Sequence, residues 1–506
     1  MIPVLLQNEA FTLDESTISS GIISEKELMD NAGKAIAQFI VENIKDPFNQ
    51  EYIVLAGPGN NGGDAIISHY YLLDYGINSE LILFNKQQKE SWIFKNYTIQ
   101  TNSISFYDGK NELNPEYWYL DGIFGVGLKR SIDGNYEEII NRLIDCSNII
   151  SIDIPSGIYC DNGMVAGTNI NAVYTLTMGY PKVGHFFNDG LDSSGEVHVL
   201  DIGFNDISDP HSFLQLFDHE DVCGTLPVYL ENTNKYTRGK LVSIAGSKGY
   251  TGACILANQA AIKTGVGIAK VIIPESLNGI FETILTEAIT IPIQEHDNGT
   301  FTTENSSDIL KETQWADAVI FGPGLKIDGN SKEWMAQVLR KLDKPLVLDA
   351  SGFLPLIENK LKISELPTET VLTPHYGEFS RIFNIELKQI IEDPISTIKG
   401  IIPILEGRVL ILKGATNIII NSDGGIWLMN HGTSALATAG TGDVLAGMLG
   451  SLLAQGKQLD DAVLLAIYLH GECVHQYNKL ISGDGLTASD LNTMIPHALN
   501  EMNHVH

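Results

Sequence analysis

Two glycine-rich stretches of this chain carry residue types that bind phosphate, and each ends in an aspartate. The first reads Gly57-Pro58-Gly59-Asn60-Asn61-Gly62-Gly63-Asp64, and the second reads Ala439-Gly440-Thr441-Gly442-Asp443 ahead of an apolar helix. Glycine lets the backbone approach a ligand closely, and backbone N–H groups at a helix start attract anions. The first stretch is neither the GxGxxG dinucleotide motif nor a P-loop, because no GK[ST] follows it. Both stretches therefore predict anion-binding loops.

Two further loops place carboxylates where a strand is expected to end. Asp121 begins a glycine-containing loop with two adjacent cations, Lys129 and Arg130, which can meet phosphates. Asp153 ends an apolar strand and precedes Ser156. Because ligands of open α/β sheets bind beyond the carboxyl ends of the strands, these loops and the first glycine-rich stretch can line one crevice. Their amide, hydroxyl and carboxylate oxygens suit a hard cation rather than zinc.

The elements that must position these loops alternate along the whole chain. A capped helix is expected after Ser24, with Glu27 at the capping-box position. Further helices are expected from about 64, at 135–145, from about 253, at 441–455 and at 460–477. Strands are expected at 52–57, 81–84, 120–125, 149–157, 174–178, 196–203, 240–247, 268–274, 317–325, 345–352, 371–375 and 409–420. This alternation predicts parallel sheets with helices on both faces.

A domain junction is expected within the stretch 203–235, where periodicity is weak and Asp, Ser, Asn and Pro cluster. The length of 506 residues is enough for two or three domains. We therefore predict two tandem doubly wound α/β domains, the first spanning 1–217 and the second 218–506.

The charge balance excludes several classes of partner. The chain has 32 Lys+Arg against 62 Asp+Glu, a net charge of −30, which argues against a nucleic-acid binder and against anionic membrane surfaces. Its apolar runs are far shorter than the roughly 20 residues of a membrane span, and its N-terminus lacks the pattern of a signal peptide. Five widely spaced cysteines without a CxxC favour a reducing compartment, and we expect a cytoplasmic protein.

Taken together, the motifs of the first domain resemble the NAD(P)H-hydrate epimerase family over about residues 10–205. They are LMDNAG (28–33), GNNGGD (59–64), DGIFGVGL (121–128), DIPSG (153–157) and TLTMGYPKVG (175–184). The family binds NADH or NADPH in which water has added across the C5=C6 bond of the nicotinamide, and it interconverts the R and S forms at C6. The resemblance implies a Rossmann-like first domain with this activity.

The resemblance also assigns site residues. Potassium would be coordinated by Asn61, Asp121 and Ser156, and Asp153 would act near the reacting ring. A positioned carboxylate there can shuttle a proton and stabilise an iminium-like cation. The hydrated dinucleotide would contact Asn60, Asn61, Gly62, Gly63, Asp64, Gly125, Val126, Gly127, Leu128, Lys129, Arg130, Ser131 and Asp153. Two positions depart from the family pattern, Ala65 and Tyr159.

The second domain resembles the NAD(P)H-hydrate dehydratase family of ribokinase-like proteins from about residue 235 to the last helix. Its motifs are AGSKGYTGA (245–253), GPGL (322–325), LTPHYGE (372–378), KGAT (413–416) and GTGD (440–443). By motif, Ala253, Gly324, His375 and Asp443 would contact the hydrated nucleotide. The adenine nucleotide would contact Lys413, Gly414, Ala415, Thr416, Asn417, Gly440, Thr441 and Gly442.

The resemblance implies that a nucleotide phosphorylates the C6 hydroxyl and that phosphate then leaves. Asp443 would be the base, and magnesium would accompany the nucleotide. ADP is favoured over ATP as the donor because the fusion of the two domains is typical of bacteria. We also expect a homo-oligomer. Where relatives often carry Asp-Ala-Asp at 349–351, this chain has Ser351 in the third place, which leaves the role of that loop in doubt.

Two alternatives stay open from the sequence. The second domain can be a vitamin or small-molecule kinase, although such kinases often carry Asn where this chain has His375. The first domain can be a non-catalytic nucleotide-binding or interaction module. Retention of Asn61, Asp121, Asp153 and Ser156 argues against that second alternative.

Overall fold

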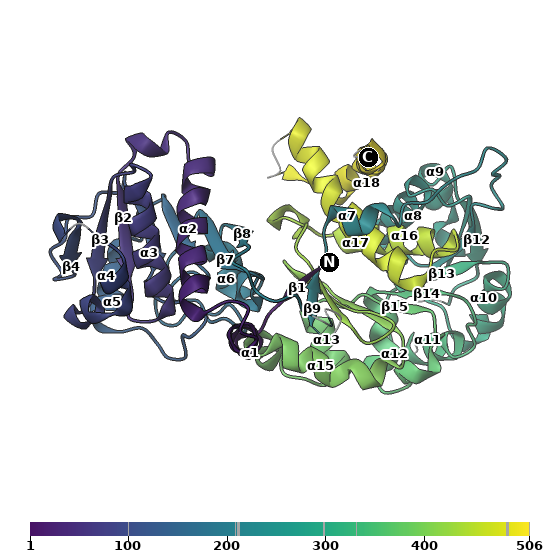
Figure 1. Ribbon diagram of the computed structural model, residues 1–506. Helices are drawn as coiled ribbons and strands as arrows, with labels where there is room; N and C mark the ends of the chain where they lie inside the picture. Colours follow the sequence, from purple (N-terminus) through teal and green to yellow (C-terminus); the bar gives the residue numbers. More distant parts are fainter. Residues whose placement is uncertain are drawn as a thin grey trace. The chain divides into compact units, whose positions relative to one another are not determined.

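The computed structural model describes residues 1–99, 101–207, 209, 213–296, 299–329, 331–481 and 485–504 (Figure 1). It divides into two compact units, the first built from Ile2–Leu214 with Ile391–Asp393 and the second from Gln215–Ile390 and from Pro394 onward. Part of the expected junction, residues 208 and 210–212, lies outside the described residues. In the described ranges, no helix combines the length and the apolar character needed to cross a bilayer.

The first unit contains a seven-stranded sheet in the order β4-β3-β2-β5-β6-β7-β8, and all of its strand pairs are parallel. The chain starts in the middle of this sheet and builds outward in both directions, so the switch point lies between β2 and β5. All of these strands except β4 were predicted; β4 is a short, only partly buried run. The strands are β2 (Tyr52–Ala56), β3 (Ser79–Leu83), β4 (Ile104–Phe106), β5 (Trp118–Gly122), β6 (Ile149–Ile152), β7 (Tyr174–Met178) and β8 (Glu196–Leu200).

Helices cover both faces of this sheet, as predicted. Because side chains alternate along a strand, Ile53 and Leu55 of β2 pack on the side of α5, whereas Val54 and Ala56 pack on the side of α2 and α3. The helices are α1 (Gln7–Ser19), α2 (Glu25–Asn43), α3 (Asn60–Asp74), α4 (Trp92–Asn96), α5 (Gly134–Arg142) and α6 (Asn188–Ser193); a short strand, β1 (Ile2–Val4), precedes them.

The starts of α2 and α3 differ in how well they were predicted. Helix α2 begins after Ser24 as expected, with the Glu27 amide donating to Ser24 Oγ at 3.3 Å and the Ser24 amide donating to the Glu27 carboxylate at 2.8 Å. The predicted start of α3 at Asp64 is wrong, because the helix already begins at Asn60. A Cβ on Gly62 would lie 1.8 Å from the Gly57 carbonyl oxygen. The glycines therefore let the motif coil directly into the first helical turn.

The sheet of the second unit contains the run β18-β17-β16-β15-β14-β13-β10-β11-β12, which is parallel except that β17 is antiparallel to both neighbours. The single strand predicted at 409–420 is therefore wrong: it is a hairpin that turns at 413–416. Strands β9, β12 and β18 were not predicted. The bounds are β9 (Leu214–Leu216), β10 (Lys240–Ile244), β11 (Ile268–Pro274), β12 (Ile289–Ile293), β13 (Ala318–Phe321), β14 (Leu346–Leu348), β15 (Thr370–Leu372), β16 (Val409–Leu412), β17 (Asn417–Ile420) and β18 (Ile426–Met429).

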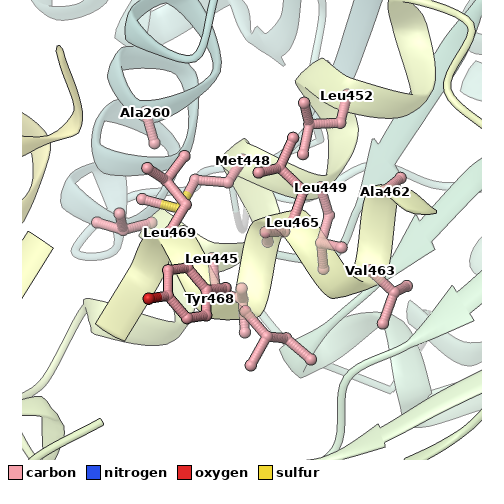
Figure 2. Close-up of a cluster of buried hydrophobic side chains, with 14 of the residues drawn as sticks. Ala260, Leu445, Met448, Leu449, Leu452, Ala462, Val463, Leu465, Tyr468 and Leu469 are labelled. Carbon is pink, nitrogen blue, oxygen red and sulfur yellow. The ribbon is translucent and has the colours of Figure 1, made fainter. Parts of the chain in front are cut away.

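The core of the second unit lies where α8, α16 and α17 pack together, with Ala260, Leu445, Met448 and Leu465 in contact (Figure 2). A Cβ on Gly447 would lie 2.1 Å from the Ala257 carbonyl oxygen, so α16 runs unusually close to α8. This packing fixes the glycine loop ahead of α16. Of the helices in this unit, only α8, α16 and α17 were predicted individually. The helices are α7 (His219–Cys223), α8 (Thr251–Lys263), α9 (Asn278–Ile284), α10 (Ser306–Thr313), α11 (Ser331–Leu339), α12 (Leu354–Ile357), α13 (Tyr376–Phe383), α14 (Leu387–Glu392), α15 (Pro394–Leu405), α16 (Thr441–Ala454), α17 (Leu459–Leu480) and α18 (Ala488–His504).

Candidate active sites

A cavity of 540 Å³ opens at the carboxyl ends of β2, β5 and β6 in the first unit. It lies at the switch point of the sheet, where α/β proteins bind their ligands. Its walls also include residues of α1 and α2, among them Phe11, Asp14 and Met29. The predicted residues that line it are Asn60, Asn61, Asp64, Gly125, Val126, Gly127, Leu128, Lys129, Arg130 and Asp153, whereas Gly62, Gly63, Ser131, Asp121 and Ser156 are not part of its lining.

The glycine loop presents an uncapped helix start to this cavity. Gly59 is the N-cap of α3, and no side chain caps it. A Cβ on Gly57 would lie 1.8 Å from the Ile123 carbonyl oxygen, so only glycine fits between the two loops. The first amides of α3 therefore have no side-chain acceptor and can receive an anion.

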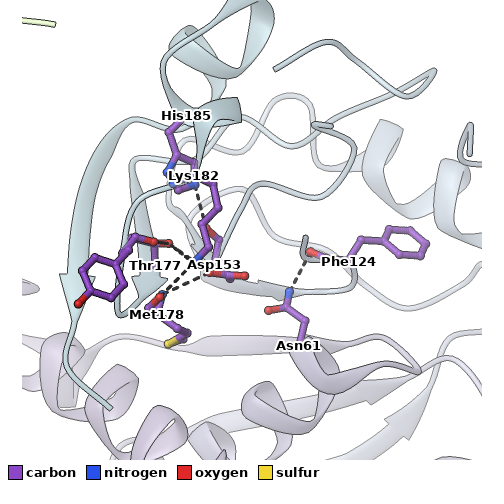
Figure 3. A network of polar contacts seen from close by, with 8 residues as sticks. Asn61, Phe124, Asp153, Thr177, Met178, Lys182 and His185 are labelled. Atoms are coloured by element: carbon purple, nitrogen blue, oxygen red, sulfur yellow. Dashed lines mark hydrogen bonds and ion pairs between the residues drawn. The ribbon is translucent and has the colours of Figure 1, made fainter. Parts of the chain in front are cut away.

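The residues predicted to coordinate potassium gather around the backbone of Phe124. The Asn61 amide nitrogen donates to the Phe124 carbonyl at 2.8 Å (Figure 3), and the Phe124 amide donates to Ser156 Oγ at 2.8 Å. Asp121 is fully buried and accepts from Ser156 Oγ at 2.6 Å, from Ser151 Oγ at 2.9 Å, and from the amides of Ser156 and Ile123 at 2.9 and 3.2 Å. Burial raises the pKa of Asp121, although these hydrogen bonds oppose the rise.

This donor set fits a hard monovalent cation. The Asn61 amide uses its nitrogen on Phe124, which leaves its oxygen for a ligand, and Ser156 Oγ and the Phe124 carbonyl add two more oxygens. Asp121 already receives four hydrogen bonds, about as many as a carboxylate can accept. Its contribution is therefore negative charge and the orientation of Ser156. Among the described residues, no group of three His, Cys, Asp or Glu side chains is placed to hold a metal.

Asp153 forms a buried ion pair with Lys182, which sequence reasoning did not single out (Figure 3). Lys182 Nζ lies 2.5 Å from Asp153 Oδ1, and the same oxygen accepts from Thr177 Oγ1 at 3.1 Å. Burial alone would raise the pKa of Asp153, but the Lys182 charge and these hydrogen bonds outweigh it and lower the pKa. Nε2 of His185 lies 2.9 Å from the Asp153 carbonyl oxygen, and burial lowers the pKa of His185 to about 4. Asp153 is therefore held as an anion beside a neutral imidazole.

Two other carboxyls of the cavity, Asp14 and Asp64, have raised pKa values, in contrast to Asp153. Burial, followed by the charge of Asp153, raises the pKa of Asp14 to about 6. Burial also raises the pKa of Asp64 well above its ordinary value, with Asp153 and Asp14 adding to the rise. No hydrogen bond or ion pair to either carboxyl is found in the described part of the chain. Asp14 lies in α1 outside every motif, so no sequence signal marked it.

In the second unit, the GTGD loop forms the start of α16. Gly440 is the N-cap at φ = +93°, a left-handed conformation that favours glycine, and no side chain caps the helix. Thr441 Oγ1 donates to the Leu436 carbonyl at 2.8 Å, and Nε2 of His470 lies 2.9 Å from the Thr441 carbonyl oxygen. Burial, and then the charge of Asp349, raises the pKa of Asp443 to about 7, which the nearby Lys413 opposes. Asp443 is thus poised to take up a proton near neutral pH.

Lys413 is brought to this loop by the β16–β17 hairpin. Lys413 Nζ donates to Asp349 Oδ1 at 2.9 Å. Nζ also lies close to Gly442, since a Cβ added to that glycine would be 3.3 Å from it. Asp349 also accepts from Thr373 Oγ1 at 2.8 Å and is almost fully buried. Burial lowers the pKa of Lys413, but the charge of Asp349 outweighs burial and raises it. The loop 349–351, whose role the sequence left in doubt, therefore supplies the counter-ion of Lys413.

The other residues predicted for the second site lie at the start of α8, at the start of α13 and in the turn 413–417. A Cβ on Gly324 would lie 3.1 Å from the Ala253 Cβ, so these two residues adjoin at the start of α8. His375 bridges to Lys413 and is the N-cap of α13, where its Nδ1 accepts from the Gly377 amide at 3.0 Å. Nδ1 therefore carries no proton, and Nε2 is left to donate. Of the predicted turn 413–417, Thr416 is buried and Ala415 is exposed.

The two units together define a nucleotide-handling enzyme with two separate carboxylate sites, one in a Rossmann-like sheet and one in a ribokinase-like sheet. The NAD(P)H-hydrate dehydratase family matches residues 241–497, and the family described as YjeF-related protein N-terminus matches residues 25–184.

Relatives with both domains match nearly the whole chain. A bifunctional NAD(P)H-hydrate repair enzyme of Dictyoglomus turgidum is 34% identical and covers 94% of both chains. The enzyme of the same name from Thermofilum pendens is 30% identical and covers 98% of this chain and 96% of its own. The chain therefore belongs to the family of bifunctional NAD(P)H-hydrate repair enzymes.

A solved structure shows the fold of the second unit. A ribokinase-like superfamily protein of Enterococcus faecalis is 22% identical, with a TM-score of 0.50, and covers 57% of this chain and 96% of its own. The predicted fold class is confirmed. Family membership favours the bifunctional repair enzyme over a vitamin kinase fused to a non-catalytic module.

Proposed function

We propose that this chain repairs hydrated NADH and NADPH in two steps. Residues 1–217 interconvert the R and S hydrates, and residues 218–506 dehydrate the S form with ADP as the phosphoryl donor. The observation that carries the proposal is that each matched domain has its own carboxylate site, at Asp153 and at Asp443. The fusion has a chemical reason, because dehydration of the S form alone would leave the R form unrepaired.

In the first site, we assign the phosphates to the uncapped start of α3, residues 60–63, and to the loop Gly125–Ser131, whereas Asp64 contacts the hydrated ring. Lys129 and Arg130 supply local positive charge in an otherwise acidic chain. Asp153 faces the hydrated ring as a fixed anion and stabilises positive charge that develops at N1 and C6. Potassium, held by the oxygens around Asn61, Asp121 and Ser156, would supply a further positive charge beside the pyrophosphate.

In the second site, Ala253, Gly324 and His375 position the hydrated nucleotide so that its C6 hydroxyl meets Asp443. Asp443 takes the hydroxyl proton as the oxygen attacks the terminal phosphoryl group of the nucleotide. Lys413–Asn417 and Gly440–Gly442 hold the adenine nucleotide, and the amides of α16 stabilise the transferring charge. Phosphate then leaves C6, and loss of a C5 proton restores the dihydropyridine. Magnesium would be carried by the phosphates of the nucleotide and would neutralise their charge.

One assay tests both steps. Purified protein is mixed with R- or S-hydrate of NADH or NADPH, with ADP, ATP or no nucleotide, and recovery of the reduced cofactor is followed by absorbance. We expect both hydrates to yield the reduced cofactor with ADP, more slowly with ATP and not at all without nucleotide, where the R and S hydrates only interconvert. Consumption of neither hydrate, or transfer of phosphate to a vitamin instead, would overturn the proposal.

We further propose that the protein works in the cytoplasm as a homo-oligomer. The five cysteines are all free and widely spaced, which supports a reducing compartment. Subcellular fractionation and light scattering test the two parts. Recovery outside the cytoplasm contradicts the first part, and a monomeric mass contradicts the second.

A further inference from the structure

We propose that Asp14 is the acid that protonates the departing C6 hydroxyl in the epimerase site, with Asp64 as its partner for the returning water and Asp153 as a fixed anion. This inference rests on the proposed function of the first domain. It deepens that function by separating the group that supplies charge from the groups that move protons.

The geometry of the cavity separates the three carboxyls. Asp14, Asp64 and Asp153 line the same 540 Å³ space but come from three different elements: α1, the start of α3 and the end of β6. Asp153 Oδ1 receives the Lys182 ammonium, the Thr177 hydroxyl and the Met178 amide. A carboxylate bound in this way keeps its negative charge and is a poor proton carrier.

Asp14 is placed for the opposite role. It is half-buried, and no hydrogen bond or ion pair to it is found among the described residues. Its neighbours along the cavity wall, Leu5, Phe11 and Leu13, are apolar and favour its neutral form. The charged groups that act on Asp14 are Asp153, Lys182, Glu25 and Asp64, which line the same cavity, and Glu15, which is exposed outside it.

The proton and electron balance of the step is simple. The C6–O bond breaks, the oxygen takes the Asp14 proton and leaves as water, and the N1 lone pair forms an N1=C6 double bond. The resulting cation faces the anion of Asp153. A water molecule then bonds to the other face of C6, its surplus proton passes to the Asp64 carboxylate, and the N1=C6 pair returns to N1. In the reverse direction, Asp64 is the acid and Asp14 is the base.

The test compares Asp14→Asn with Glu15→Gln, because Glu15 is exposed on the same helix and outside the cavity. We expect D14N to lower the rate of R-to-S interconversion by roughly 100-fold or more, the usual size of a general acid contribution. Dehydration of S-hydrate should be unchanged, and E15Q should stay within about twofold of wild type. Wild type should show a bell-shaped pH profile, because one carboxyl must be protonated and the other ionised. A D14N rate within threefold of wild type would overturn the assignment.

Isotope labelling and thermal unfolding keep the result interpretable. In H₂¹⁸O, wild type should gain one solvent oxygen at C6 for each epimerisation, and D14N should gain label only as slowly as its residual epimerisation. Epimerisation without label would overturn the step. At pH 7.5, D14N should unfold at the same temperature as wild type or a higher one, because ionising a buried, unpaired carboxyl opposes folding above its pKa. A D14N protein that does not fold would overturn the statement that Asp14 is buried without a partner. Wild type that does not interconvert the hydrates defeats the proposed function, whereas active wild type with active D14N defeats only the role of Asp14.

Discussion

The two sites share one arrangement, a buried Asp–Lys ion pair beside a second carboxyl of raised pKa. In the first domain, Lys182 pairs with Asp153 at 2.5 Å beside Asp14; in the second, Lys413 pairs with Asp349 at 2.9 Å beside Asp443. In both, burial raises the pKa of the second carboxyl, and the negative charge of the paired carboxylate adds to the rise. The same device therefore supplies a proton carrier near neutral pH in each site.

The two sites differ in how many hydrogen-bond donors of the lysine ammonium are free to bind a ligand. Lys182 Nζ donates to Asp153, to Thr177 Oγ1 at 2.9 Å and to the Met178 carbonyl at 3.0 Å, so all three of its donors are used. In the described part of the chain, the Lys413 ammonium donates only to Asp349, and it lies beside Gly442 of the glycine loop. One lysine is a counter-ion, and the other can also bind phosphate. This difference separates a site for epimerisation from a site for phosphoryl transfer.

The largest expected effect comes from removing the proton carrier of the second site. Asp443→Asn should lower dehydration of S-hydrate by roughly 10³-fold, within the range of general base catalysis, because no other group takes the C6 hydroxyl proton. Epimerisation should be unchanged when R- and S-hydrate are resolved by chromatography.

The matched variant in the first site is Asp153→Asn, which should abolish epimerisation and leave dehydration of S-hydrate intact. If both folded variants lost both activities, the assignment of two separate sites would be wrong.

The next prediction compares the roles of Lys182 and Lys413 by replacing each with methionine. Lys182→Met should cost roughly 3 kcal/mol of first-domain stability, since it leaves Asp153 buried without a counter-ion. Lys413→Met leaves the buried Asp349 without its counter-ion and should cost a similar amount of stability in the second domain, but it should in addition raise the KM for ADP by roughly tenfold, the value of one charge-assisted contact. Hydrogen exchange of the β5 and β6 amides measures the first effect, and steady-state kinetics measures the second.

The control for this comparison is Lys34→Met, at an exposed position of α2, which should change stability by no more than about 0.5 kcal/mol. A rise in the KM for ADP in the Lys182 variant, rather than the Lys413 variant, would reverse the proposed roles.

Sequence reasoning located the loops better than the partners of their side chains. Buried parallel strands are apolar runs, so most of them were visible, whereas the short or partly exposed β4 and β12 were not. The motifs marked Asp153 and Lys413 because their loops are local. Their partners Lys182 and Asp349 lie 29 and 64 residues away, and only the folded sheet brings them together. Asp14 has no motif at all and is recognised only by the cavity it lines.

A smaller effect tests whether Asp349 tunes Asp443. Asp443 must be ionised to act as a base, so kcat/KM for dehydration should rise with pH through its pKa of about 7. Asp349→Asn removes a negative charge that raises this pKa, and the midpoint of the profile should move to lower pH. The maximal rate should fall less than in the Asp443 variant. A midpoint that stays in place would show that burial alone raises the pKa.

The smallest effect concerns helix α2, which carries no member of the shared Asp–Lys arrangement. Helices α3 and α16 begin at Gly59 and Gly440 with no side-chain cap, whereas α2 begins with the capping box of Ser24 and Glu27. Ser24→Ala should therefore cost about 1 kcal/mol of first-domain stability, read from hydrogen exchange of α2, without changing either activity. Ser24→Gly should cost only a few tenths of a kcal/mol, since glycine is itself tolerated at this position. A loss of epimerisation in Ser24→Ala would mean that Glu25 and the other cavity-lining residues of α2 depend on this cap for their position.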